Sequence, residues 1–266
     1  KHAITVASGT DSLEIALRAL EIGPGDEVIT VPFTWISTAE AIALVGAKPV
    51  FVDIDLLDFN IAVDQIEAAI TPSTKALMPV SLFGQMPDYD AINAIAKKYN
   101  LPVIEDAAQS FGATQHGRRS CGVTTIASTS FYPAKPLGCY GDGGALCTNN
   151  DELAKKIKMI ANHGQQQKYV HEVIGCNSRL DTIQAAVLEV KLRQLDNYID
   201  ARREVAERYD EAFASIPGVR IPFRADDSKH VFHQYTLILE NASRAALQEA
   251  LNANDIPSMI YYPIPA

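Results

Sequence analysis

Short apolar runs alternate with helical patterns through the first 150 residues, and this alternation constrains the fold more than any other feature. The apolar runs are rich in Val and Ile and lack the every-second-residue polarity of a half-exposed strand, which predicts strands buried on both faces. They cover Ala3–Ala7, Glu27–Val31, Pro49–Asp53, Ala76–Leu82 and Pro102–Glu105. Helical patterns lie between them at Asp11–Leu20, Thr38–Val45, Val63–Ile70 and Tyr89–Tyr99. Strand–helix–strand order predicts an α/β fold around a mainly parallel sheet with flanking helices.

The pattern changes after Asn149. A helix is expected at Asp151–Asn162, and Leu180–Phe213 is a nearly unbroken helical run that could be one bent helix or two. Further on, Val219–Pro222 and Gln234–Glu240 are typical of antiparallel strands, and a last helix is expected at Ser243–Asn252. The sequence therefore predicts a large α/β domain over residues 1–176 and, over residues 177–266, a long connecting helix with a smaller α+β domain.

Composition excludes several classes of function. The net charge is −9, with 23 Lys and Arg against 32 Asp and Glu, which disfavours non-specific nucleic-acid binding. No apolar run approaches the roughly 20 residues of a membrane helix. The four cysteines form no CxxC pair and the histidines show no metal spacing, so neither a metal nor a disulfide framework is expected. We expect a cytoplasmic protein that has no membrane partner.

A turn of small residues joins the first strand to the first helix. Residues 7–10 read ASGT, and a helix that begins in this way offers unpaired backbone amides and its positive dipole end to an anion. Ser8 and Thr10 are also ordinary N-cap residues. The turn alone therefore predicts either a phosphate site or a simple helix cap.

Two carboxylates end a predicted buried strand. Glu105 and Asp106 close the Pro102–Glu105 run, and the carboxyl edge of a parallel sheet is where ligands bind. Such a residue either forms a structural ion pair or faces a ligand, and the strand pattern does not decide between them.

Lys135 lies between Pro133 and Pro136, with four glycines close behind at 138, 141, 143 and 144. A lysine between two prolines is in neither a regular helix nor a strand, so its amine is held in a stiffened loop. Most loop lysines are merely solvated. A lysine beside hydrogen-bond donors that bind a phosphate can instead form a Schiff base, when burial or a neighbouring cation lowers its pKa.

Pyridoxal phosphate is bound through three groups, which are its phosphate, its ring nitrogen and its aldehyde. The sequence offers one partner for each: a helix start that can bind a phosphate, an acidic residue at a strand end, and a fixed lysine. The chain resembles the DegT/StrS-type nucleotide-sugar aminotransferases, a family of fold-type I pyridoxal-phosphate enzymes. The likeness runs through SGTDSLEIAL, PFTWISTAEAI, GAKPVFVDID, EDAAQSFGA, SFYPAKPLGCYGDGGA, NHGQ, NSRLDTIQAA and IYYPIP, in that order.

The resemblance implies two catalytic residues. Lys135 is expected to form the internal aldimine and to shuttle the proton between the substrate and the cofactor. Asp106 is expected to pair with the ring nitrogen and keep it protonated.

The resemblance also implies a set of cofactor contacts. Gln109 is expected to bond the ring's phenolic oxygen, and Trp35 to stack on the ring, although a core aromatic is the alternative for Trp35. The phosphate is expected to be bound by Thr10, Ser130, the backbone at Asp11 and, from a neighbouring subunit, Asn177.

Substrate contacts are implied at Arg179, for which an intersubunit salt bridge is the alternative, and at Tyr262 in the Tyr-Pro-x-Pro element. The implied assembly is a homodimer with shared active sites. The family normally extends about 50 residues before Lys1 and continues past that element, so the chain is expected to lack segments at both ends, part of the small domain among them.

The implied reaction transfers an amino group from L-glutamate to a ketone on a nucleotide-activated hexose. PFTWISTAEAI and NSRLDTIQAAVLEVKL most resemble the enzymes that aminate C3 of a UDP-3-keto-N-acetylglucosaminuronic acid in surface polysaccharide (O-antigen) synthesis. Amination at C4 of a UDP- or dTDP-linked 6-deoxy sugar is the alternative. The family's sugar dehydratases carry a histidine where this chain has Lys135, and a non-enzymatic homologue that binds the cofactor is the third alternative.

Overall fold

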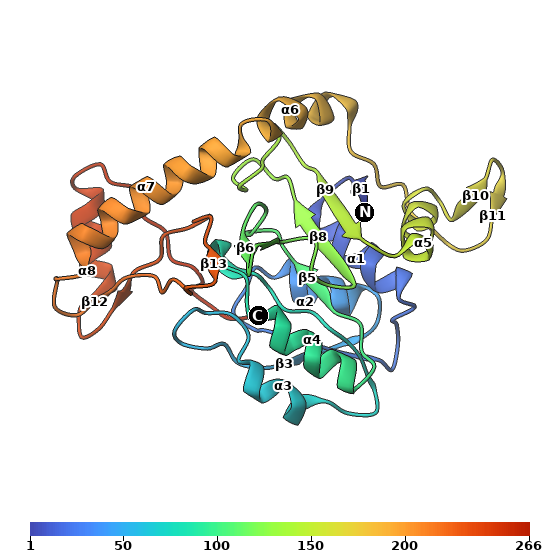
Figure 1. Cartoon of the computed structure of the whole chain (residues 1–266), viewed down its shortest axis with the longest axis horizontal. Helices are drawn as coiled ribbons and strands as arrows, with labels where there is room; N and C mark the ends of the chain where they lie inside the picture. Colours follow the sequence, from blue (N-terminus) through green and yellow to red (C-terminus); the bar gives the residue numbers. More distant parts are fainter.

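The computed structural model describes all residues from Lys1 to Ala266, and a seven-stranded sheet lies at its centre (Figure 1). Hydrogen-bonded pairing and parallel bridges at Leu77–Val103 and Val80–Asp106 place the strands in the order β3-β2-β4-β5-β8-β9-β1. Only β9 runs against its neighbours, β8 and β1. The bounds are β1 His2–Val6, β2 Glu27–Thr30, β3 Lys48–Phe51, β4 Thr74–Leu77, β5 Ile104–Asp106, β8 Ile126–Ser130 and β9 Gly144–Thr148. The predicted α/β class with a mainly parallel sheet is confirmed.

Helices cover both faces of this sheet. The helices are α1 Gly9–Ala19, α2 Ser37–Leu44, α3 Val63–Ala69, α4 Tyr89–Lys98, α5 Asp151–Ala161, α6 Thr182–Leu192, α7 Leu195–Phe213 and α8 Arg244–Asn252, with a short 3-10 turn, η1, at Leu82–Gly84. One apolar core joins α1, α2 and α5 to strand residues such as Val28 and Ile104. The other joins α4 and the start of α7 to Ile29 and Val103, which are the residues next to Val28 and Ile104 in the sequence. Successive residues of a strand therefore pack into opposite cores, because their side chains point to opposite faces of the sheet.

The prediction that every early strand is buried on both faces is wrong for the two edge strands. In β1, buried and more exposed residues alternate, and in β3 both Lys48 and Phe51 are exposed. An edge strand has one neighbour only, so part of its surface meets water even in a parallel sheet.

Strands β8 and β9 are central but give no apolar run in the sequence. Their sequences are IASTS and GALCT, and nearly every residue is buried. Small side chains let α1 approach closely, because a Cβ added at Gly144 would lie 2.4 Å from the Ser8 carbonyl oxygen. The helix start therefore meets the sheet where a larger residue could not fit.

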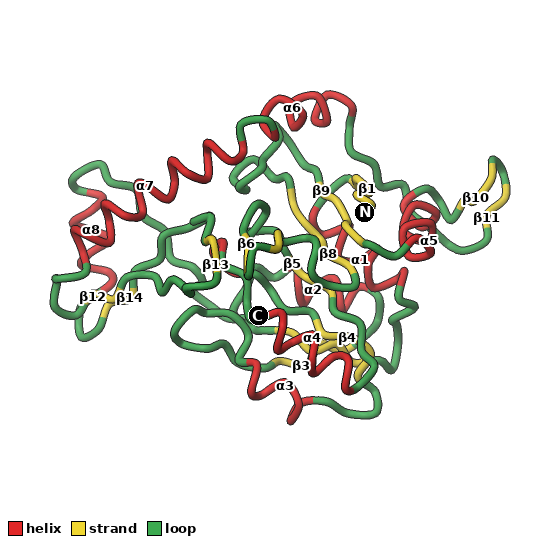
Figure 2. The backbone as a smooth tube through the Cα atoms, viewed as in Figure 1, coloured by secondary structure: helices red, strands yellow, loops and turns green.

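The later part of the chain is mostly loops with short strands (Figure 2). The long helical run is two helices, α6 and α7, which separate at Arg193–Gln194. Strands β12 Val219–Arg220 and β14 Ile238–Leu239 pair in the expected antiparallel sense but are shorter than predicted. A hairpin, β10 Gln165–Gln167 with β11 Val170–His171, extends beyond α5. Strand β13 Ser228–Lys229 joins β6 Thr114–Gln115 and β7 Arg118–Arg119. The domain division at residues 176 and 177 stays a prediction, and none of the helices has the length and apolarity that a bilayer crossing needs.

Glu105, in the middle of β5, is a fully buried carboxyl group that faces away from the adjacent Asp106. Ser120 Oγ donates to its Oε1 at 2.7 Å, Ser81 Oγ donates at 3.2 Å, and the Cys121 amide donates to Oε2 at 2.9 Å. Burial nevertheless raises the pKa of Glu105 to about 7. Because the unfolded chain holds this proton less tightly, folding is favoured most at low pH, and the contribution is lost as the pH rises towards 7.

We expect Glu105→Gln to flatten the pH dependence of stability. The amide keeps an acceptor for Cys121 and a donor for a serine but cannot ionise. Between pH 5 and pH 8 the wild type should lose on the order of 2–3 kcal/mol more unfolding free energy than the variant. Urea unfolding at both pH values measures this difference, with Glu67→Gln, an exposed residue of α3, as the control for the substitution itself. Equal slopes for the wild type and Glu105→Gln would contradict the assignment.

Candidate active site

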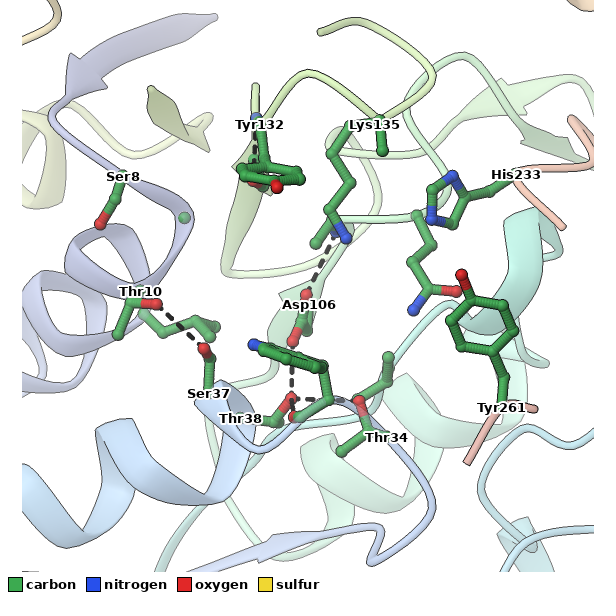
Figure 3. A pocket seen from close by; sticks show the side chains of 18 of the residues that line it. Ser8, Thr10, Thr34, Ser37, Thr38, Asp106, Tyr132, Lys135, His233 and Tyr261 are labelled. Carbon is green, nitrogen blue, oxygen red and sulfur yellow. Dashed lines mark hydrogen bonds between the residues drawn. The ribbon is translucent and has the colours of Figure 1, made fainter. Parts of the chain in front are cut away.

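A cavity of about 550 Å³ opens at the carboxyl ends of β5 and β8, beside the start of α1. It gathers Asp106 from β5, Ser130 from the end of β8, Lys135 from the following loop and Thr10 from α1 (Figure 3). Segments far apart in the sequence complete the wall, namely the Thr34–Thr38 turn, His233–Gln234 and Tyr261–Tyr262.

The start of α1 forms one end of the cavity. Ser8 caps the helix, since its Oγ accepts from the Asp11 amide at 3.0 Å. At Gly9, an added Cβ would lie 2.7 Å from the Ser130 Cβ, so glycine is needed for α1 to reach β8. Thr10 Oγ1 donates to Ser37 Oγ at 3.0 Å. The hydroxyls of Ser8, Thr10 and Ser37 thus lie with the first helical amides at the positive end of the helix dipole.

Asp11 is turned away from this cavity. Its carboxylate accepts from Ser8 Oγ at 2.9 Å and from Ser178 Oγ at 2.6 Å, and the residue does not line the cavity wall. Its amide is already the donor in the Ser8 cap. A phosphate contact from the Asp11 backbone stays a prediction, whereas Gly9 and Thr10 carry the helix-start amides that no intrahelical acceptor takes up.

Asp106 is a buried carboxylate held by two donors. Thr38 Oγ1 donates to Oδ2 at 2.8 Å and the Ala108 amide donates to Oδ1 at 3.1 Å. Only 5% of the residue is exposed. Burial raises the pKa of Asp106, and Thr38, Ala108 and the Lys135 charge oppose that rise. A buried anion of this kind is stabilised further by a cation placed against it.

Lys135 faces the same cavity from a loop that is closed by its own backbone. Its amide donates to the Tyr132 carbonyl oxygen at 2.9 Å, and the flanking prolines fix the chain on both sides. Burial lowers the pKa of Lys135, while the Asp106 charge opposes this shift. The amine therefore loses its proton more easily than a surface lysine does, as a nucleophile or a base requires.

Gln109 is positioned by both ends of its amide. Its Oε1 accepts from the Phe83 amide at 2.7 Å, and its Nε2 donates to Tyr262 Oη at 2.9 Å. Burial raises the pKa of Tyr262 to about 12. Trp35 also lines the cavity but is 62% exposed, so the core-aromatic alternative for Trp35 is wrong.

Sequence reasoning missed part of the wall. Asp142, Tyr132, His233, Gln234 and Tyr261 all line the cavity. Tyr132 and Asp142 lie within the Lys135 loop, so their proximity to the lysine was a usable signal. His233 and Gln234 lie about 100 residues further along the chain, and no spacing in the sequence links them to Lys135.

Asn177 and Arg179 lie outside the cavity. Both are exposed, and neither lines the wall. Asn177 forms an antiparallel bridge with Asn162, next to the end of α5. Within one chain these two residues do not reach Lys135, so their assigned roles stay predictions that need a second subunit.

The residues present suit pyridoxal phosphate. Helix-start amides with hydroxyls at one end fit a phosphate, the buried Asp106 carboxylate fits a protonated ring nitrogen, and the Lys135 amine fits an aldehyde. Glycine at position 9 brings the start of α1 against Ser130, because an added Cβ would lie 2.7 Å from the Ser130 Cβ and 3.1 Å from its Oγ. No other acidic side chain is buried in the wall to compete with Asp106 for the ring nitrogen.

Comparisons with known proteins agree with this geometry. The model of the DegT/DnrJ/EryC1/StrS aminotransferase family matches residues 1–266. A UDP-2-acetamido-2-deoxy-3-oxo-D-glucuronate aminotransferase from Pseudomonas aeruginosa is 54% identical over the whole chain, which spans 73% of that protein. A "pleiotropic regulatory protein" from Geobacillus stearothermophilus is 50% identical over the whole chain, which spans 71% of it.

Solved structures match over the whole chain as well. A DegT/DnrJ/EryC1/StrS aminotransferase from Brucella abortus superimposes with a TM-score of 0.96 at 45% identity, covering all of this chain and 72% of its own. A Bacillus subtilis structure with bound pyridoxamine phosphate has a TM-score of 0.93 at 36% identity, over the whole chain and 61% of its own. The chain therefore belongs to the DegT/DnrJ/EryC1/StrS family of pyridoxal-phosphate-dependent aminotransferases.

Proposed function

We propose that this protein transfers an amino group from L-glutamate to C3 of a UDP-3-keto-N-acetylglucosaminuronic acid, in the synthesis of a surface polysaccharide such as an O-antigen. The observation that carries the proposal is the presence, in one cavity, of the buried Asp106 carboxylate and the Lys135 amine. The 54% identity to the Pseudomonas aeruginosa enzyme supports the choice of sugar.

Bound pyridoxal phosphate would supply an electron sink for carbanion chemistry at the substrate carbon. Asp106 would keep the ring nitrogen protonated, and Thr38 would keep Asp106 oriented through its 2.8 Å hydrogen bond. Lys135 would hold the cofactor and then carry the proton at its Nζ. Thr10 and Ser130 would bind the phosphate. Gln109 would bond the ring's phenolic oxygen, and Trp35 would cover the ring.

Two alternatives remain as candidate functions. Relatives named as transaminases of dTDP-linked 3-amino sugars are 44% and 45% identical, which supports a dTDP-linked sugar as a second candidate. Amination at C4 stays an alternative that rests on the family resemblance alone. The relative from Geobacillus stearothermophilus that is named as a regulatory protein supports a non-enzymatic role as the other candidate. The position of Lys135 in the cavity favours an enzyme over a scaffold, because a scaffold has no need of an amine with a lowered pKa.

The proposal is tested by turnover with L-glutamate across a panel of UDP- and dTDP-linked keto-sugars. We expect the UDP-3-keto uronate to be the best substrate by kcat/KM. We also expect Lys135→Ala to lower kcat by about 10²–10⁴-fold and to lose the pyridoxyl adduct that borohydride fixes on the wild type. Peptide mapping locates the adduct, and Lys168→Ala, on the exposed hairpin, is the matched control. An adduct that persists on another lysine would contradict the site.

We propose that the protein is a homodimer in which Asn177 binds the phosphate in the partner's site. Support comes from the exposure of Asn177 outside its own cavity. Exposed apolar residues on the same stretch of chain, such as Ile174 and Ile183 at 87% and 77%, indicate a surface suited to a second copy.

Subunit exchange tests this arrangement. A mixture of inactive Lys135→Ala and inactive Asn177→Ala proteins should regain roughly a quarter of wild-type activity, because a heterodimer combines both lesions in one site and leaves its second site intact. Mixing Lys135→Ala with the Lys135→Ala/Asn177→Ala double variant should regain none. If the first mixture also stays inactive after exchange is verified by mass spectrometry, Asn177 does not act across the interface.

A further inference from the structure

His233 enters the cavity from the carboxyl-terminal part of the chain, where its ring lies beside the Lys135 side chain (Figure 3). The segment that carries it is held on both sides. Arg202 Nη1, from α7, donates to the Phe232 carbonyl oxygen at 3.0 Å. The Val231 amide donates to the Gly84 carbonyl oxygen at 2.9 Å, and the Gln234 amide donates to the Phe83 carbonyl oxygen at 3.3 Å.

Gly84 permits this close approach. Its φ is +111°, and a Cβ there would lie 2.9 Å from the amide nitrogens of both Phe232 and His233. The segment is therefore packed backbone to backbone against η1, and the His233 ring has little freedom to leave the cavity. A side chain fixed in this way suits a defined contact rather than a solvated position.

One ring nitrogen of His233 is buried and the other faces the cavity. Nδ1 is fully buried and has no hydrogen-bond partner, and no protein group bonds to Nε2. A buried N–H without an acceptor is rarer in folded proteins than a buried acceptor without a donor. We therefore assign the proton to Nε2, so the ring presents an N–H donor to the cavity.

The ring is also neutral. Burial and the positive charges of Lys135 and Arg202 lower the pKa of His233 to about 3. The imidazole thus donates a hydrogen bond across the physiological pH range without adding a second cation next to the Lys135 amine.

We propose that His233 is a further catalytic residue, whose Nε2–H donates a hydrogen bond to the carbonyl oxygen of the keto substrate beside Lys135. This inference rests on the proposed function, because amino transfer brings a carbonyl oxygen to the lysine in both half-reactions, on the keto-sugar and on the keto acid left by the donor. Neutral imidazole is an established electrophile towards carbonyls, and a fixed donor acts most strongly in a site sheltered from water.

Two isosteric variants separate the two ring nitrogens. A glutamine places its Nε2 near the histidine Nε2 and keeps the donor, whereas an asparagine places its amide near Nδ1 and loses it. We expect His233→Gln to stay within about threefold of wild-type kcat, and His233→Asn to lose about 10–100-fold in kcat with little change in KM. The control is His116→Asn, on an exposed turn at φ +49°, a conformation that asparagine accepts.

A spectroscopic readout does not depend on turnover. The probe is [2-¹³C]2-oxoglutarate bound to the pyridoxal form of the enzyme, which holds no amino group to transfer. Isotope-edited infrared spectra should show the ketone band at lower frequency in the wild type and in His233→Gln than in His233→Asn. Borohydride trapping of the cofactor shows that each variant retains its site.

The outcomes are distinct. Two results would overturn the role of His233 and leave the proposed function standing. One is a ketone band in the wild type at the same frequency as in His233→Asn, and the other is an equal loss of kcat in both variants. Failure of the wild type to aminate any keto-sugar would instead overturn the proposed function. A shifted band that disappears only in His233→Asn supports His233 as the carbonyl donor.

Discussion

The buried Asp106 carboxylate at the end of β5 is the constraint on which the site depends. A carboxylate this deep is costly unless donors and a cation compensate it. Thr38, at the start of α2, and the Ala108 amide supply the donors, and Lys135 supplies a nearby positive charge. Burial raises the pKa of Asp106 and lowers that of Lys135, so one buried environment prepares both groups for pyridoxal-phosphate chemistry.

The fold delivers these groups through close backbone approaches. Gly9 lets α1 meet Ser130, Gly144 lets β9 pass under the Ser8 carbonyl, and Gly84 lets the His233 segment lie against η1. Each approach brings together segments that lie far apart in the sequence. The phosphate end and the proposed carbonyl donor are therefore positioned by close packing of the backbone, which favours a preorganised site.

Sequence patterns predicted the parts of this arrangement that depend on local chemistry. Val- and Ile-rich runs predicted β1 to β5, and the prolines around Lys135 indicated a fixed loop. The patterns could not show β8 and β9, because their Ser, Ala, Thr and Gly residues make no apolar run, nor the exposure of the edge strands, which depends on strand order. His233 was missed because only the tertiary fold brings it to Lys135. The resemblance supplied the roles of Asn177 and Arg179, which a single chain does not test.

The protonation state of the cofactor ring tests the central claim most directly. In enzyme reconstituted with pyridoxal phosphate labelled with ¹⁵N in the ring, we predict the ¹⁵N chemical shift of a protonated pyridine nitrogen at pH 8, well above the pKa of free pyridine nitrogens. Asp106→Asn should bind the cofactor and show the shift of a neutral ring, because an amide cannot stabilise the cation. A neutral ring in the wild type would contradict the account.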